Sequence, residues 1–261
     1  MDVHRVERFV KLQGKLKAYF DESDQRLPDG HIWVISGGIA LADQWETVSR
    51  EWRSVLDEFE VPHFHATDFY VRHRRSPYER LTDDDCEDLA HRLARVIISG
   101  QVQAPGRAVI TDPQAHERHL QRKQRREWKQ LLGGDPYFFC SCGIVEAVWS
   151  ILNDKGLDVP VEFFFEQRRG IGRVIDWFQE SLEKSSKNAD IGARQKGLPE
   201  LQAADFITYE ARQWARWEAG VGNKPRDRNL LSSLPRSGRV WDARGGVLRE
   251  LTPAELTTPK S

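Results

Sequence analysis

Four carboxylates occupy places where the sequence pattern predicts the ends of strands or the start of a helix. Asp21 and Glu22 directly follow the alternating stretch KLKAYF, which is typical of a β-strand. Glu166 ends the apolar run VEFFFE, and Asp205 lies in the helical pattern LQAADFITYEA. Buried carboxylates repel one another and are costly unless a positive charge lies between them. Because carboxylate oxygens suit hard divalent cations, these acids are candidate ligands of Mg²⁺ or Mn²⁺.

The acids could converge because they lie on the first strand, on a later central strand and on the last long helix. Two ions about 3.5–4 Å apart at such a site would bracket a phosphodiester, one activating water and the other stabilising the leaving oxygen. We therefore interpret Asp21, Glu166 and Asp205 as metal ligands and Glu22 as a weaker fourth candidate. Gln202 lies one helical turn before Asp205 on the same face, so we expect it to orient this helix and its ligand.

Each acid also has an ordinary structural interpretation. Asp21 and Glu22 could be solvated acids at a strand-to-loop junction, and they could reach one site only if the strand twists or ends there. Glu162, earlier in VEFFFE, competes for the place of the acid on this strand. Asp205 could lie on a hydrated helix face, where the positive N-terminal end favours an acid. The metal interpretation therefore depends on the combination of acids.

The elements that would position these acids alternate strands and helices, which predicts an α/β fold with a mixed sheet. A first hairpin is expected from strands 15–23 and 31–41, joined by the turn-forming QRLPDG, with Gly37 and Gly38 marking a bulge or a close backbone approach. The residues 61–69 are expected to be irregular. Further strands are expected at 101–111 and 159–167 and within 184–200, and helices at 43–59, 82–99, 114–132, 137–152, 170–183 and 199–218.

The chain shows no internal repeat or long linker, so we predict one domain over residues 1–261, with a core of about 15–219. The extension 220–261 contains a candidate hairpin, RVWDARGGVLREL. The apolar runs are too short for a membrane span and the start has no signal-peptide core, which favours a cytoplasmic protein without a membrane partner. Three cysteines argue against a disulfide framework.

The net charge of −1 gives no general support for nucleic-acid binding, so that partner must be argued from local patches. One patch lies in the helix expected at 114–132, a second is RHRR at 72–75, and a third, with Lys184 and Lys187, precedes the last helix. A solvated helix face explains the first patch equally well. The phosphate-binding candidates are Arg122, Lys123, Arg125, Arg126, Arg194 and Lys196.

Several short motifs in order resemble the domain-of-unknown-function family 3800. These are FDES after the first strand, FHATDF after the first long helix, an acid closing a central apolar strand, and LQAADFITYEA. The family is marked by an N-terminal D-E-S-G and a late Q-x-x-D, which correspond to Asp21–Glu22 and to Gln202–Asp205. Asp24 stands in place of the family glycine, where a turn is expected, and could add another carboxylate near the site.

The resemblance covers about residues 15–217 and implies a ribonuclease-H-like mixed sheet flanked by helices, with extra helical insertions. It implies a metal-dependent nuclease or a relative of one, acting on DNA, RNA or a hybrid. The alternative is a non-catalytic protein of the same fold that binds nucleic acid or protein. A haloacid-dehalogenase-type phosphatase is disfavoured because Ser23 stands where its second Asp is needed.

His65, in FHATDF, is a candidate catalytic residue at the edge of the site. It could contact the scissile phosphate, assist proton transfer or only hydrogen-bond its own loop. His63 and Asp68 are its neighbours, and His-x-His with Asp could also be a transition-metal site.

Overall fold

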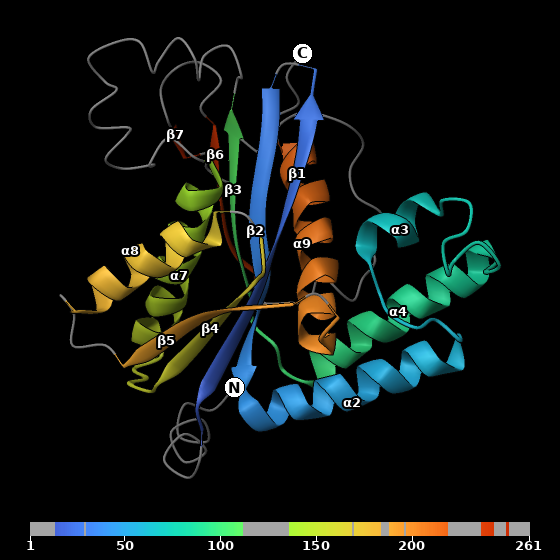
Figure 1. The fold of residues 1–261 in the computed structure, drawn as a ribbon, viewed down its shortest axis with the longest axis horizontal. Coiled ribbons are helices and arrows are strands. Elements are labelled where there is room, and N and C mark those ends of the chain that lie inside the picture. The colour runs from blue at the N-terminus through green and yellow to red at the C-terminus, as the bar shows by residue number, and fades with distance from the viewer. Residues whose placement is uncertain are drawn as a thin grey trace.

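The computed structural model describes residues 14–28, 30–111, 136–168, 170–183, 188–195, 197–218, 236–242 and 249–250. Within them lies a mixed seven-stranded sheet in the order β5-β4-β1-β2-β3-β6-β7, with helices on both faces (Figure 1). The strands are β1 (Leu16–Leu27), β2 (Gly30–Leu41), β3 (Ala104–Thr111), β4 (Val161–Glu166), β5 (Ala189–Arg194), β6 (Arg236–Asp242) and β7 (Arg249–Glu250). The predicted α/β class with a mixed sheet is thus confirmed.

The sheet contains both the expected hairpin and parallel neighbours. β1 and β2 pair antiparallel from Leu16–Leu41 to Leu27–Gly30, and β3 pairs antiparallel with β2. On the other side of β1, β4 and then β5 run parallel to it. β6 joins β3 in parallel and pairs antiparallel with β7, so the C-terminal hairpin expected from the sequence extends this same sheet.

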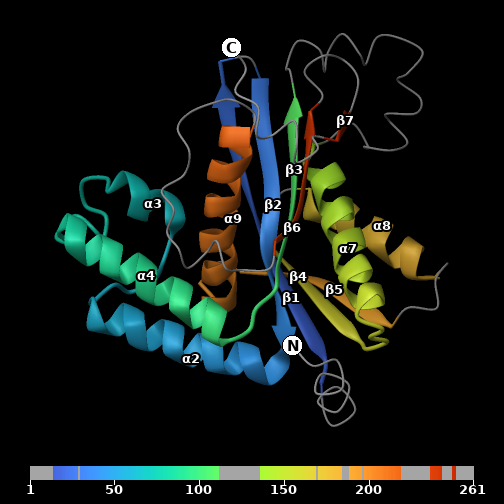
Figure 2. The ribbon, with the colours of Figure 1, turned by 180° about the vertical axis from the view of Figure 1, so that it is seen from behind.

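Two helical layers cover the two faces (Figures 1 and 2). α7 (Pro136–Asp154) and α8 (Ile171–Glu183) lie on one face, against a core that includes Phe20, Phe163 and Phe165. α9 (Pro199–Glu218) crosses the other face. Outside it lie α2 (Ala42–Glu58), α3 (Ala66–Val71) and α4 (Asp83–Ser99), and this layer shares a core with Tyr19 and Phe164.

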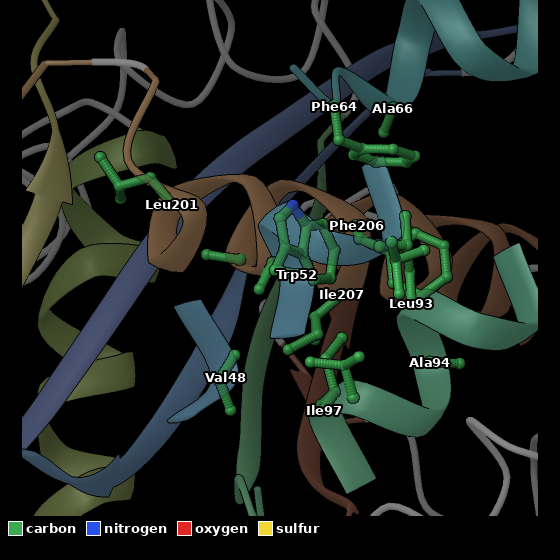
Figure 3. Close-up of a cluster of buried hydrophobic side chains, with 14 of the residues drawn as sticks. Val48, Trp52, Phe64, Ala66, Leu93, Ala94, Ile97, Leu201, Phe206 and Ile207 are labelled. Atoms are coloured by element: carbon green, nitrogen blue, oxygen red, sulfur yellow. The ribbon is translucent and has the colours of Figure 1, made fainter. Parts of the chain in front are cut away.

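The core between α2, α4 and α9 follows the helical periodicity of the sequence. Trp52 is fully buried, and its ring contacts Phe64 and Phe206 edge-on at centroid distances of 5.8 and 6.4 Å. Figure 3 shows these rings together with Ile207 of α9 and Ile97 of α4. This packing holds α9 against the sheet, because its buried residues share one core with Tyr19 of the first strand.

Three local expectations were wrong. β1 does not end at Ser23 but continues to Leu27, because β2 pairs with it along its whole length. Asp24 lies inside this strand opposite Trp33 rather than in a turn. The stretch predicted to be irregular contains α3. The helix expected at 114–132 and residues 184–187 lie outside the described residues.

The expected close approach at Gly37 is confirmed. A Cβ atom placed there would lie 1.9 Å from the carbonyl oxygen of Tyr19, which no side chain could tolerate. Gly37 pairs with Phe20, the residue before Asp21, so its lack of a side chain allows β2 to approach β1 closely at this point.

Candidate carboxylate metal centre

Two central parallel strands bring Asp21 and Glu166 together. Phe20 and Phe165 are the last paired residues of β1 and β4, and each acid is the next residue on its strand. Side chains alternate between the faces of a sheet, so these acids continue the face of Tyr19 and Phe164. The rings of Tyr19 and Phe164 stack at a centroid distance of 4.9 Å, so an apolar pair lies next to the two acids on this face.

Three carboxylates meet at this point. Asp21, Glu22 and Glu166 each offer one oxygen, and these oxygens all lie within 4.8 Å of one another. In an octahedral Mg²⁺ site with bonds of about 2.1 Å, ligand oxygens are about 3.0 Å apart when adjacent and about 4.2 Å apart when opposite. The all-oxygen donor set therefore suits a hard divalent cation, and the limit of 4.8 Å on its spacing is slightly wider than the distance between opposite ligands of one ion.

Asp21 is the most buried member of this cluster. Its residue is 4 % exposed, and its Oδ1 accepts a hydrogen bond of 2.8 Å from the backbone N–H of Glu22. Burial raises the pKa of Asp21 well above its ordinary value, and a side-chain hydrogen bond with Glu166 and the charges of Asp205, Glu166 and Glu22 raise it further. In the absence of a cation, burial and the neighbouring carboxylates therefore favour the protonated form of Asp21.

Glu22 approaches the cluster although its neighbour Asp21 belongs to the other face of the strand. Its Oε1 lies 2.6 Å from Nη1 of Arg168, two residues beyond the end of β4. The guanidinium of Arg168 in turn lies over the ring of Tyr137, at 4.3 Å from the ring centroid. Arg168 was not among the residues expected at the site, and its only signal in the sequence is a basic residue two positions after Glu166.

Asp205 does not belong to the group of three close carboxylates. Its Oδ2 accepts a hydrogen bond of 2.8 Å from the backbone N–H of Ala66, the first residue of α3. Its charge still contributes to the raised pKa of Asp21, so it faces the cluster from α9. One turn later, the Thr208 hydroxyl donates to the carbonyl oxygen of Ser36 at 2.9 Å, which fastens α9 to β2 beside Asp21.

Gln202 is buried and connects three segments. Its Oε1 accepts hydrogen bonds from Trp52 Nε1 at 3.1 Å and from the backbone N–H of Phe64 at 2.8 Å. Its Nε2 donates to the carbonyl oxygen of Gly197 at 3.0 Å. Gln202 thus ties the start of α9 to α2 and to the loop before α3.

His65 is held at the start of α3. Its Nδ1 lies 2.8 Å from Oδ2 of Asp68, and its backbone N–H donates to the Tyr78 hydroxyl at 3.0 Å. That hydroxyl donates to the carbonyl oxygen of His63, so the loop is fixed on both sides of Phe64. The contact with Asp68 leaves Nε2 as the ring nitrogen that faces away from this carboxylate.

The basic candidates divide into described and undescribed residues. Arg194, opposite Glu166 on β5, lies over the Phe164 ring at 4.5 Å from its centroid. Arg72 pairs with Asp83 at the far end of α3. Asp24 lies 2.7 Å from His31 Nε2 instead of joining the cluster. Outside the described residues lie Arg122, Lys123, Arg125, Arg126, Lys184, Lys187 and Lys196.

In comparisons with known proteins, the chain matches no protein-family model and no curated protein sequence. Within the part of the chain that the structure describes, no helix combines the length and the apolar character needed to cross a bilayer.

Proposed function

We propose that the protein is a divalent-metal-dependent nuclease of the ribonuclease-H-like type that hydrolyses nucleic-acid phosphodiester bonds. The observation that carries this proposal is the meeting of Asp21, Glu22 and Glu166 at the junction of two central parallel strands. Three carboxylates at this spacing, one of them buried, are unfavourable without a proton or a cation. The motif resemblance to the domain-of-unknown-function family 3800 supports the same assignment.

Asp21, Glu22 and Glu166 would hold the ion, which is Mg²⁺ or Mn²⁺, with Asp205 facing it from α9. When bound, an ion of this kind lowers the pKa of a coordinated water and neutralises charge on the phosphate. A metal ion binds the ionised form of Asp21, so the raised pKa of this group couples metal binding to proton release. The anchored start of α3 presents His65 as a candidate proton donor or acceptor.

The nucleic acid would be bound by cations around this carboxylate centre. The guanidinium of Arg194 lies over the ring of Phe164, which is two residues before Glu166 and on the same face of the sheet. In this position Arg194 can bind a phosphate beside Glu166. Lys196 and the segment of Arg122–Arg126 are further candidates from the sequence. We propose that these residues bind the substrate backbone, without selecting a base sequence.

Cleavage of labelled oligonucleotides tests this function. Single-stranded DNA, duplex DNA, RNA and an RNA–DNA hybrid are incubated with Mn²⁺, with Mg²⁺ or with EDTA. We expect metal-dependent cleavage of at least one substrate, and a loss of at least about 100-fold in Glu166→Gln. Glu162→Gln is the matched control, because Glu162 lies on the same strand but pairs with Lys15 at 3.2 Å. Equal cleavage by wild type and Glu166→Gln, or none by wild type, would refute the proposal.

A further inference from the structure

Arg168 directly contacts one of the three clustered carboxylates. Its Nη1 lies 2.6 Å from Glu22 Oε1, and the two side chains are 29 % and 21 % exposed. A pair this sheltered from water interacts more strongly than an ordinary surface pair, because solvent screens it less. In the protein without a metal, Arg168 therefore neutralises part of the negative charge of the cluster.

The contact of Arg168 with the ring of Tyr137 leaves its guanidinium able to change from one anionic partner to another. The face of its guanidinium lies 4.3 Å from the centroid of the Tyr137 ring, and this contact uses none of its five N–H donors. Tyr137 is itself buried at the start of α7, so the ring is a fixed support. A guanidinium supported by its face can exchange one oxygen partner for another at its edge by a small rotation.

Arg168 and a metal ion would compete for the carboxylate of Glu22. A divalent cation bound by the cluster withdraws electron density from the carboxylate oxygens and weakens their hydrogen bonds to other cations. Arg168 and the ion also repel each other at this short separation. A planar guanidinium is in turn a favoured ligand of phosphate oxygens, which it can bind through two parallel N–H groups.

We propose that Arg168 is an internal counter-ion of the site, which competes with the divalent cation for Glu22 and passes to a phosphate oxygen of the substrate when the cation binds. This inference rests on the proposed function, since it assigns the regulation of the same site. The binding of metal and the binding of phosphate then strengthen each other. A bound phosphate draws Arg168 away from Glu22 and so frees this ligand for the metal, and a bound metal frees Arg168 for the phosphate.

Calorimetric titration with Mn²⁺ alone tests the competition. The proteins are wild type, Arg168→Gln, Glu22→Gln and the double variant. We expect Arg168→Gln to bind Mn²⁺ about fivefold or more tightly than wild type. In the Glu22→Gln background the same change should have an effect of about twofold or less, because the contested ligand is already gone. A merely structural role of Arg168 would weaken metal binding and would not depend on Glu22.

Titration with thymidine 5′-monophosphate at saturating Mn²⁺ tests the transfer to phosphate. Arg168→Gln should bind this nucleotide roughly tenfold more weakly than wild type, although it binds the metal more tightly. Arg173→Gln is the matched control for both titrations, since Arg173 of α8 lies over the ring of Phe138, the neighbour of Tyr137 on α7, at 5.4 Å from its centroid. Arg168→Lys keeps the charge and serves as a second variant if the glutamine variant does not fold.

The outcomes separate this inference from the proposed function. If wild type binds Mn²⁺ and Arg168→Gln binds it equally or more weakly, the counter-ion proposal is wrong and the metal site stands. Unchanged nucleotide affinity in Arg168→Gln would also overturn the transfer. If neither wild type nor Arg168→Gln binds Mn²⁺ at millimolar concentration, both proposals fail. Binding by Arg168→Gln alone would support the competition and show that the wild-type site is held closed to metal.

Discussion

Asp21 and Glu166 occupy equivalent positions on two neighbouring parallel strands, each one residue beyond the Phe20–Phe165 pair. A hydrogen bond joins their side chains, and together with the burial of Asp21 it raises the pKa of Asp21 well above its ordinary value. Two carboxylates this close together in the sheet repel each other when both are ionised, and a bound proton or cation removes this repulsion.

Replacing Asp21 by asparagine should stabilise the metal-free protein at neutral pH. The amide keeps the size of the side chain and can donate to Glu166, and it replaces a group that folding must either protonate or bury as a charge. We expect a gain of about 1–3 kcal/mol in the free energy of unfolding, measured by urea denaturation in EDTA. Asp24→Asn is the control on the same strand, and it should give no gain because Asp24 is paired with His31. A loss of stability in Asp21→Asn would contradict the burial of unfavourable charge.

The same pKa shift predicts how stability depends on pH. The folded state binds a proton on Asp21 more tightly than the unfolded state, so this group stabilises the fold most fully below its unfolded pKa of 3.8. Its contribution is lost as the pH rises through the raised folded pKa. The difference in unfolding free energy between Asp21→Asn and wild type should therefore grow with pH from acid to neutral. A constant difference would show that the folded pKa is not raised.

Asp205 should have separable structural and functional roles. Asparagine retains an oxygen that can accept the Ala66 N–H, whereas alanine removes it. We expect Asp205→Asn to unfold like wild type and Asp205→Ala to lose about 0.5–2 kcal/mol, the range for a lost helix cap. Both should impair metal-dependent cleavage, because both remove the charge that faces Asp21. Full cleavage by Asp205→Asn would exclude a role for this carboxylate in the reaction.

Gln202 should be among the residues on which stability depends most. Gln202→Leu leaves the N–H groups of Trp52 and Phe64 without their acceptor in a buried place. We expect a loss of about 2–4 kcal/mol, measured by urea denaturation. Gln213→Leu, farther along α9, is the control, because the bond that the Gln213 side chain accepts from Arg216 is only partly buried. Similar losses in the two variants would contradict a connecting role for Gln202.

The sequence predicts much of this fold because its signals are local. The apolar faces of α2 and α4 follow the helical repeat. Thr82 is the N-cap of α4, and its hydroxyl accepts a hydrogen bond from the backbone N–H of Asp85. The apolar run of β4 marks a central strand, and Gly37 marks the close approach of β2. Asp21 and Glu166 could therefore be placed near each other before their geometry was known.

The remaining features depend on contacts between distant segments. The six-residue helix α3 begins where Asp205, 139 residues away in the chain, binds Ala66, and no local pattern indicates such a cap. β1 extends past Asp21 because β2 is long enough to pair with it as far as Leu27. The contact of Arg168 with Glu22 links the segment after β4 to its neighbour β1, and no periodicity in the sequence indicates it.

Calorimetric titration of wild type, Asp21→Asn and Asp24→Asn with Mn²⁺ tests the carboxylate centre most directly. The metal-site account predicts saturable binding by wild type, a loss of about tenfold or more in Asp21→Asn, and unchanged binding in Asp24→Asn. Proton release on binding, detected by repeating the titration in buffers of different ionisation enthalpy, should accompany the wild-type signal. Equal affinity in wild type and Asp21→Asn, or no binding by either wild type or Arg168→Gln at millimolar Mn²⁺, would contradict a metal centre built on Asp21.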